Sequence, residues 1–157
     1  MTPRRTSPPR PRARAAAPLL AALLSLAAPL PRTAAADDKS SPIRIELNKL
    51  EARAEGCRVW LVVGNPGSEA LDPLRLDLVL FGRDGVVSRR LAVDAGPLPA
   101  GKTSARIFDI AGLACGDVGS VLLNDVLACG GTGAEQRAAC VSRADPSSRA
   151  GGVAFGK

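Results

Sequence analysis

Apolar and polar residues alternate through most of the chain after residue 42, and this alternation predicts short β-strands. The clearest run is 74–80, in which leucine occupies every second position. A period of two indicates a strand with one face in the core and the other face in solvent. Similar β-rich runs occur along the rest of the chain, so we expect strands at about 43–48, 57–63, 74–80, 86–93, 103–110 and 120–128.

Turn residues separate these runs. Asn65-Pro66-Gly67 follows the second run, and Asp84-Gly85 joins the third to the fourth, which is a strong hairpin signal because both residues tolerate positive φ. A Pro/Gly-rich turn at 96–101 precedes the fifth run. Several short strands without long amphipathic helices between them predict an all-β fold, a disulfide-linked antiparallel β-sandwich of six to seven strands.

The domain boundaries follow from the same pattern. We expect the sandwich to occupy residues 37–141 and to include a short helix at about 134–141. Residues 142–157 have no clear periodicity, and we therefore predict a flexible C-terminal tail.

The first 36 residues have the composition of an export signal. They contain six arginines and no acidic residue, then an apolar run at 15–30, then Ala34-Ala35-Ala36. A basic stretch, an apolar stretch and small residues in this order predict a signal peptide cleaved after Ala36. The apolar run has 16 residues, fewer than the roughly 20 that span a bilayer, so an uncleaved anchor is the less favoured alternative. Arg4-Arg5 leaves the twin-arginine and general secretion routes both open.

Removing this signal changes the charge of the protein. The whole chain has 21 basic and 15 acidic residues, a net charge of +6. Without residues 1–36 it has 15 of each and is neutral. A basic balance would suggest nucleic acid or an anionic membrane. The charge belongs to the signal, so we expect neither partner for the mature, periplasmic protein.

All four cysteines lie in the mature part, at Cys57, Cys115, Cys129 and Cys140. An even number of cysteines in a small exported domain indicates disulfides. A zinc site is the weaker alternative, because the chain has no histidine and no Cys-x-x-Cys pair.

The expected strand order suggests how these cysteines pair. If each turn reverses the chain, the start of the second strand and the end of the fifth lie at one pole, which places Cys57 near Cys115. Cys129 lies at the far end of the sixth strand, and about ten residues at ~3.3 Å each place it about 30 Å from Cys115. A disulfide requires Cα atoms within about 7 Å. We therefore expect Cys57–Cys115 and Cys129–Cys140.

One segment matches a nucleotide-binding motif but lacks the backbone donors and the helix that such a motif needs to bind phosphate. Residues 96–103 match G-x-x-x-x-G-K-[ST], the phosphate-binding loop. That loop presents backbone N–H groups to phosphate and opens a helix, whereas Pro97 and Pro99 remove two donors and the residues after Thr103 resemble a strand. We interpret the segment as a turn that enters a strand.

The sequence offers no clear catalytic, metal or cofactor site. Without histidine, Ser-His-Asp and Cys-His arrangements are impossible, and no G-x-S-x-G segment occurs. Single carboxylates could form an acid/base pair or bind calcium, but scattered positions are more typical of surface charge. These carboxylates are Asp77, Asp84, Asp94, Asp109 and Asp125.

Two features are candidate contacts for a protein partner. Trp60 has the opposite strand parity from Cys57 and its apolar neighbours, so it is either a recognition aromatic or the cover of a second apolar layer. Asn124-Asp125 interrupts an apolar strand and indicates a bulge, a buried hydrogen-bond network or a binding edge.

Several segments also show family resemblances. Residues 58–67, 76–87 and 98–102 resemble small exported immunoglobulin-like sandwich modules of the FxLYD type. Residues 91–129 contain segments similar to a bacterial exported family labelled as Tat pathway signal sequence domain proteins. The resemblance covers about 43–140 and implies an immunoglobulin-like sandwich and twin-arginine export. It implies no catalytic residues.

Together these features predict an exported, non-enzymatic binding or accessory module of the cell envelope, with an envelope protein as its partner. A carboxylate-based hydrolase acting on carbohydrate and a carrier of a small ligand or metal are the alternatives.

Overall fold

The computed structural model describes residues 41–157, so the predicted signal peptide lies outside the described part of the chain. Eight strands, one α-helix and one 3₁₀ turn follow one another along these residues. Their bounds are β1 (Ile43–Arg53), β2 (Gly56–Gly64), β3 (Leu74–Gly82), β4 (Val87–Asp94), β5 (Thr103–Ala111), η2 (Cys115–Asp117), β6 (Val118–Cys129), α1 (Ala134–Arg143), β7 (Ala144–Ser148) and β8 (Ala154–Gly156).

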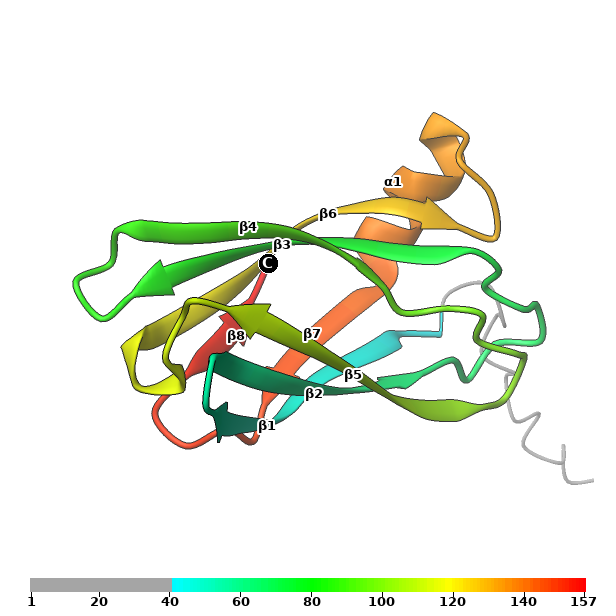
Figure 1. The fold of residues 1–157 in the computed structure, drawn as a ribbon. Helices are drawn as coiled ribbons and strands as arrows, with labels where there is room; N and C mark the ends of the chain where they lie inside the picture. Colours follow the sequence, from blue (N-terminus) through cyan, green and yellow to red (C-terminus); the bar gives the residue numbers. More distant parts are fainter. Residues whose placement is uncertain (1–40) are drawn as a thin grey trace, which may run out of the picture. The chain divides into compact units, whose positions relative to one another are not determined.

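The strands form two four-stranded sheets that pack face to face (Figure 1). Sheet I has the order β5-β2-β1-β7, and sheet II has the order β4-β3-β6-β8. The predicted all-β sandwich is thereby confirmed. All six strands expected from the alternating pattern are present, as is the short helix, which extends to Arg143.

Aliphatic side chains of both sheets fill the space between them. Sheet I contributes Leu47 and Leu61, and sheet II contributes Leu76 and Leu78, all at most 2% exposed. Burying one such side chain stabilises a fold by about 1.5–3 kcal/mol, so this layer supplies most of the driving force. The alternation in the sequence therefore reflects strands whose inward side chains form the core between the two sheets.

The C-terminal residues are not a flexible tail, and that prediction is wrong. Within residues 142–157, β7 pairs with β1 and β8 pairs with β6, so the segment joins the edges of the two sheets. Both pairings are parallel, whereas the six predicted strands pair antiparallel with one another. Val153 and Phe155 anchor β8 in the core. Strands of five and three residues are too short to produce a recognisable alternation.

The two disulfides connect the cysteines that the strand order paired. Cys57 and Cys115 have Cα atoms 4.9 Å apart, and Cys129 and Cys140 have Cα atoms 6.4 Å apart. The first bond joins the start of β2 to the turn after β5, and the second joins the end of β6 to α1. No cysteine is free.

The described part of the chain fits a location outside the cytoplasm, since disulfides persist in oxidising compartments. Among residues 41–157 no helix has the length and apolar character needed to cross a bilayer.

Candidate functional site

The outer face of sheet I carries an apolar patch in which Trp60 is the largest side chain. Trp60 lies opposite Ile107 of β5, and its strand neighbour Val62 lies opposite Ala105. Because Val59 and Leu61 point into the core, the residues between and after them point outward. We call the four residues Trp60, Val62, Ala105 and Ile107 the Trp60 face.

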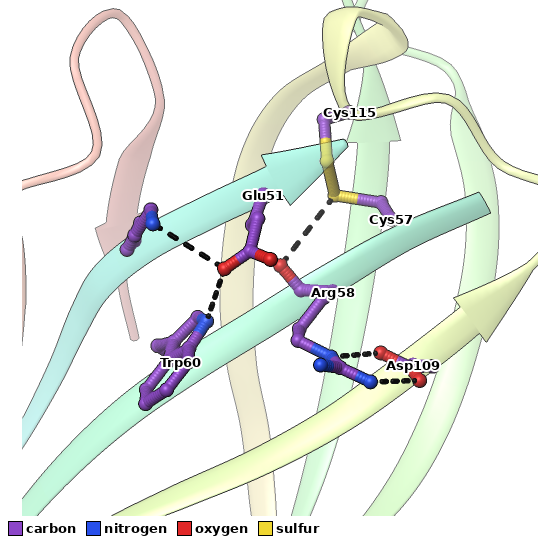
Figure 2. The surroundings of a disulfide bond; sticks show 7 residues. Glu51, Cys57, Arg58, Trp60, Asp109 and Cys115 are labelled. Carbon is purple, nitrogen blue, oxygen red and sulfur yellow. Dashed lines mark hydrogen bonds and ion pairs between the residues drawn. A yellow bond between two sulfur atoms is a disulfide. The ribbon is translucent and has the colours of Figure 1, made fainter. Parts of the chain in front are cut away.

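A hydrogen bond orients the indole ring of Trp60. Its Nε1 donates to Glu51 Oε2 on β1 at 3.2 Å (Figure 2). Lys49 Nζ lies 3.3 Å from the same oxygen, and Arg53 lies 3.2 Å from the other oxygen of the carboxylate. The polar edge of the ring is thus satisfied within the sheet. The apolar surface of the ring remains partly exposed to solvent, so a partner could contact it.

An ion pair borders the patch on the row next to Trp60. Arg58 Nε and Nη2 donate to the two carboxylate oxygens of Asp109 at 2.7 and 2.9 Å (Figure 2). These hydrogen bonds hold the pKa of Asp109 below its usual value. Glu51 pairs with Arg58 in the strand register, so a charged row runs across β1, β2 and β5 beside the apolar row.

Ile107 is the large apolar side chain of the patch that is exposed. Among residues 41–157 the large apolar side chains that are exposed are Ile107 at 51%, Val86 at 62% and Val87 at 57%. Val87 begins β4 on sheet II and Val86 directly precedes it, whereas Ile107 lies beside Trp60. The sequence pattern did not single out Ile107, because nothing in the sequence shows which outward residue of β5 meets which residue of β2.

Asn124 and Asp125 lie on sheet II, so the structure does not bring them together with Trp60. The register of β3 and β6 shifts between Asp77 and Leu78, which leaves Asn124 as the extra residue of a bulge. Asn124 Nδ2 donates to Asp77 Oδ2 at 2.6 Å. The polar pair is therefore explained by a bulge and a hydrogen-bond network.

The centre of that network is a buried carboxylate. Asp77 is 2% exposed and accepts two hydrogen bonds from the Arg90 guanidinium, at 2.9 and 2.7 Å. The hydrogen bonds from Arg90, supported by Asn124, lower the pKa of Asp77 although burial opposes the shift. Asp125 lies opposite Asp77 in the register but its carboxylate is 3.7 Å from Arg137. Each carboxylate thus has its own cation, which is the pattern of structural ion pairs.

The carboxylates of residues 41–157 form no metal-binding cluster with one another or with cysteine. Asp94 and Asp109 are paired with arginines of neighbouring strands. Asp84 accepts the backbone N–H of Val86 in the β3–β4 turn.

The segment that matches the phosphate-binding loop uses its backbone donors within the protein. The N–H groups of Leu98, Gly101 and Lys102 donate to the carbonyls of Leu71, Gly67 and Pro99, respectively. β5 begins at Thr103, so no helix opens from the loop. A phosphate group would find neither a cradle of free donors nor a helix N-terminus.

We predict that Lys102→Ala leaves the protein without a measurable change in nucleotide affinity or stability. The side chain is exposed at the end of a turn, and its backbone contacts do not depend on it. Calorimetric titration with ATP and Mg²⁺ should give no binding heat for either protein. Binding to the wild type that disappears in the variant would contradict this account.

Comparison of the chain with protein-family models, curated proteins and solved structures gives no match. A functional assignment therefore depends on the chemistry of the described surface.

Proposed function

We propose that this protein is an exported, non-enzymatic binding module of the periplasm that holds a protein partner against the Trp60 face. The observation that carries the proposal is the outward-facing Trp60–Ile107 row, in which Trp60 is half-buried and Ile107 is exposed. Tryptophan is enriched among the residues that dominate protein–protein binding energies, and such residues lie in apolar centres with polar rims.

The polar surroundings of this row favour a protein partner. The Arg58–Asp109 pair and the Glu51 cluster hold their side chains in fixed positions around the apolar centre. Side chains that are already ordered lose little conformational entropy when a partner binds. Glu51 holds the indole nitrogen, so the ring offers its apolar surface to a partner.

Two independent features support the proposed location. The predicted signal peptide would direct residues 37–157 out of the cytoplasm. Two disulfides within one small domain would persist in an oxidising compartment such as the periplasm.

We predict that Trp60→Ala removes a partner that the wild type captures from periplasm in stoichiometric amount. Truncation of a central interface tryptophan typically costs more than about 2 kcal/mol, or roughly thirtyfold in affinity. Ile107→Ser should weaken capture as well, and Val87→Ser is the matched control because its side chain is similarly exposed on sheet II. Affinity-tagged variants of equal thermal stability should be compared by quantitative mass spectrometry.

The purified pair can then be examined through the fluorescence of Trp60. The chain has one tryptophan and no tyrosine, so its own emission, obtained after subtracting the emission of the partner alone, reports on this surface. A partner that covers the Trp60 face should shift the emission to shorter wavelength and reduce quenching by acrylamide. Equal capture by all variants, or an emission unchanged at saturation, would contradict the proposed surface.

A further inference from the structure

β5 ends sheet I with a long and regular free edge. It pairs with β2 through nine consecutive residue pairs without a shift in register, and its other side has no strand partner among residues 41–157. β4, the corresponding end of sheet II, has an irregular pairing with β3 between Leu80 and Phe81. A regular unpaired edge is the element to which extended peptides add as a further strand.

A groove lies between residues of β4 and residues of β5. Its volume is about 610 Å³, and residues 91–94 of β4 and 105–109 of β5 line it. Leu91 and Phe108 are only partly buried, and both pack against the core. We call this hollow the edge groove. An additional strand along β5 would place every second side chain into it.

A charged residue lies on the inner side of this edge. Arg106 pairs with the buried Leu61 in the register, so its side chain points toward the groove. Its guanidinium donates to the carbonyls of Ala95 and Pro97 at 2.8 and 2.6 Å. No carboxylate among residues 41–157 is within ion-pair distance of it. The groove therefore carries a cation without an anionic partner.

We propose that an extended segment of the protein partner adds to the free edge of β5 as a ninth strand, with an acidic side chain facing Arg106. This inference rests on the proposed function and specifies the chemistry of the partner. The neighbouring residue of the partner would lie opposite Ile107 and extend the Trp60–Ile107 row. The next residue away from the acid would enter the groove over Phe108. The recognised segment is thus an acidic residue adjacent to two apolar residues.

Charge disfavours a second copy of this chain as the occupant. A two-fold antiparallel pairing of β5 with itself, with full overlap, is centred on Ile107. It would place two copies of Arg106 on the same face at diagonal positions, about 7–8 Å apart. Like charges at such positions oppose pairing, and inward-pointing charges are a known protection of edge strands. Arg106 therefore disfavours self-association and selects a strand that carries an acid.

The probe is the peptide acetyl-Thr-Lys-Leu-Val-Glu-Thr-Thr-amide, whose Glu, Val and Leu would face Arg106, Ile107 and Phe108 in an antiparallel pairing. Two further peptides replace its Glu by Gln or Lys. In NMR titrations of the mature protein, the Glu peptide should shift the β5 amides and the Trp60 indole N–H. The Gln peptide should bind about tenfold more weakly, because its amide keeps a hydrogen bond to Arg106 but lacks the negative charge that strengthens it.

A charge exchange tests the role of Arg106. Arg106→Glu should bind the Lys peptide more tightly than the Glu peptide. The control is Arg89→Glu, on β4, whose guanidinium donates to the carbonyl of Ala111 at the end of β5; it should still bind the Glu peptide more tightly than the Lys peptide. Arg106→Gln, which keeps a donor for Ala95 and Pro97, should bind the Glu and Gln peptides equally and serves if Arg106→Glu does not fold.

Strand addition also predicts a backbone signature. N-methylation of one set of alternate amides in the peptide should abolish binding, and N-methylation of the other set should preserve it, since only one set faces β5.

Each of the following results would overturn the inference: no shift of β5 amides at millimolar peptide, equal affinities of the Glu and Lys peptides for the wild type, or equal effects of the two N-methylated sets.

A protein dimer in sedimentation that is lost in Ile107→Lys would show that a second copy occupies the edge. If partner capture depends on Trp60 but not on Arg106, the proposed function stands and the strand addition fails. If capture depends on neither, both fail.

Discussion

Replacing Cys57 and Cys115 together by alanine should lower the free energy of unfolding by about 4 kcal/mol, the largest loss that we expect from any change. The bond closes a loop with a sequence separation of 58 residues. In the chain-entropy description, such a cross-link restricts the unfolded chain by about 4 kcal/mol, against about 3 kcal/mol for the separation of 11 residues between Cys129 and Cys140. The larger loss corresponds to a fall in Tm of roughly 15 °C for a domain of this size.

Denaturant unfolding of both double variants measures these losses. Mass analysis without reduction is the control, and it should find no alkylatable thiol in the wild type, since both bonds are formed. Two accessible thiols in the wild type, or a larger loss for the Cys129/Cys140 variant, would show that the long loop is not the main covalent restraint.

Replacing Asp77 by asparagine should destabilise the protein by about 2 kcal/mol at neutral pH, because it weakens charge-assisted hydrogen bonds in a buried site. The pKa of Asp77 is lowered in the folded protein, first by the hydrogen bonds from Arg90. Its stabilising effect is therefore complete above the ordinary aspartate pKa near 4 and is lost as pH falls through the lower pKa of the folded state.

The acid dependence of stability should consequently be shallower in Asp77→Asn than in the wild type below about pH 4. Arg90→Gln is the informative partner variant. It leaves a buried carboxylate without its cation, whereas Asp77→Asn leaves only an exposed guanidinium, so we expect Arg90→Gln to be the more destabilised variant at pH 7. Unfolding curves from pH 3 to pH 7 compare the three proteins. Parallel pH profiles for the wild type and Asp77→Asn would contradict the network.

The alternating pattern was sufficient to predict the strands in which every residue of one face is buried. Leu74 to Leu80 and Cys57 to Val63 each place a continuous row in the core, and such rows leave a period of two in the sequence. The disulfide pairing followed from the same strands, because reversal at each turn fixes which ends meet. In contrast, β7 and β8 are held by pairing with distant strands and by few apolar side chains such as Phe155, which a local pattern does not contain.

For a related reason, only part of the candidate site could be predicted from the sequence. Parity indicated that Trp60 points outward, but not that Ile107 lies beside it or that Glu51 holds its ring nitrogen. These neighbours depend on strand order and register. The same holds for Asp77, which has the outward parity of its strand and is nevertheless buried beneath Arg90 and Asn124.

Site-specific photocrosslinking in the native envelope is the most direct test of the claim that the Trp60 face holds a protein partner. A photoreactive amino acid at position 107 should produce one discrete protein adduct, and the same group at position 87 should produce none. Trp60→Ala in the same chain should abolish the adduct at 107. Adducts of equal yield from both positions, or none from position 107, would contradict the account.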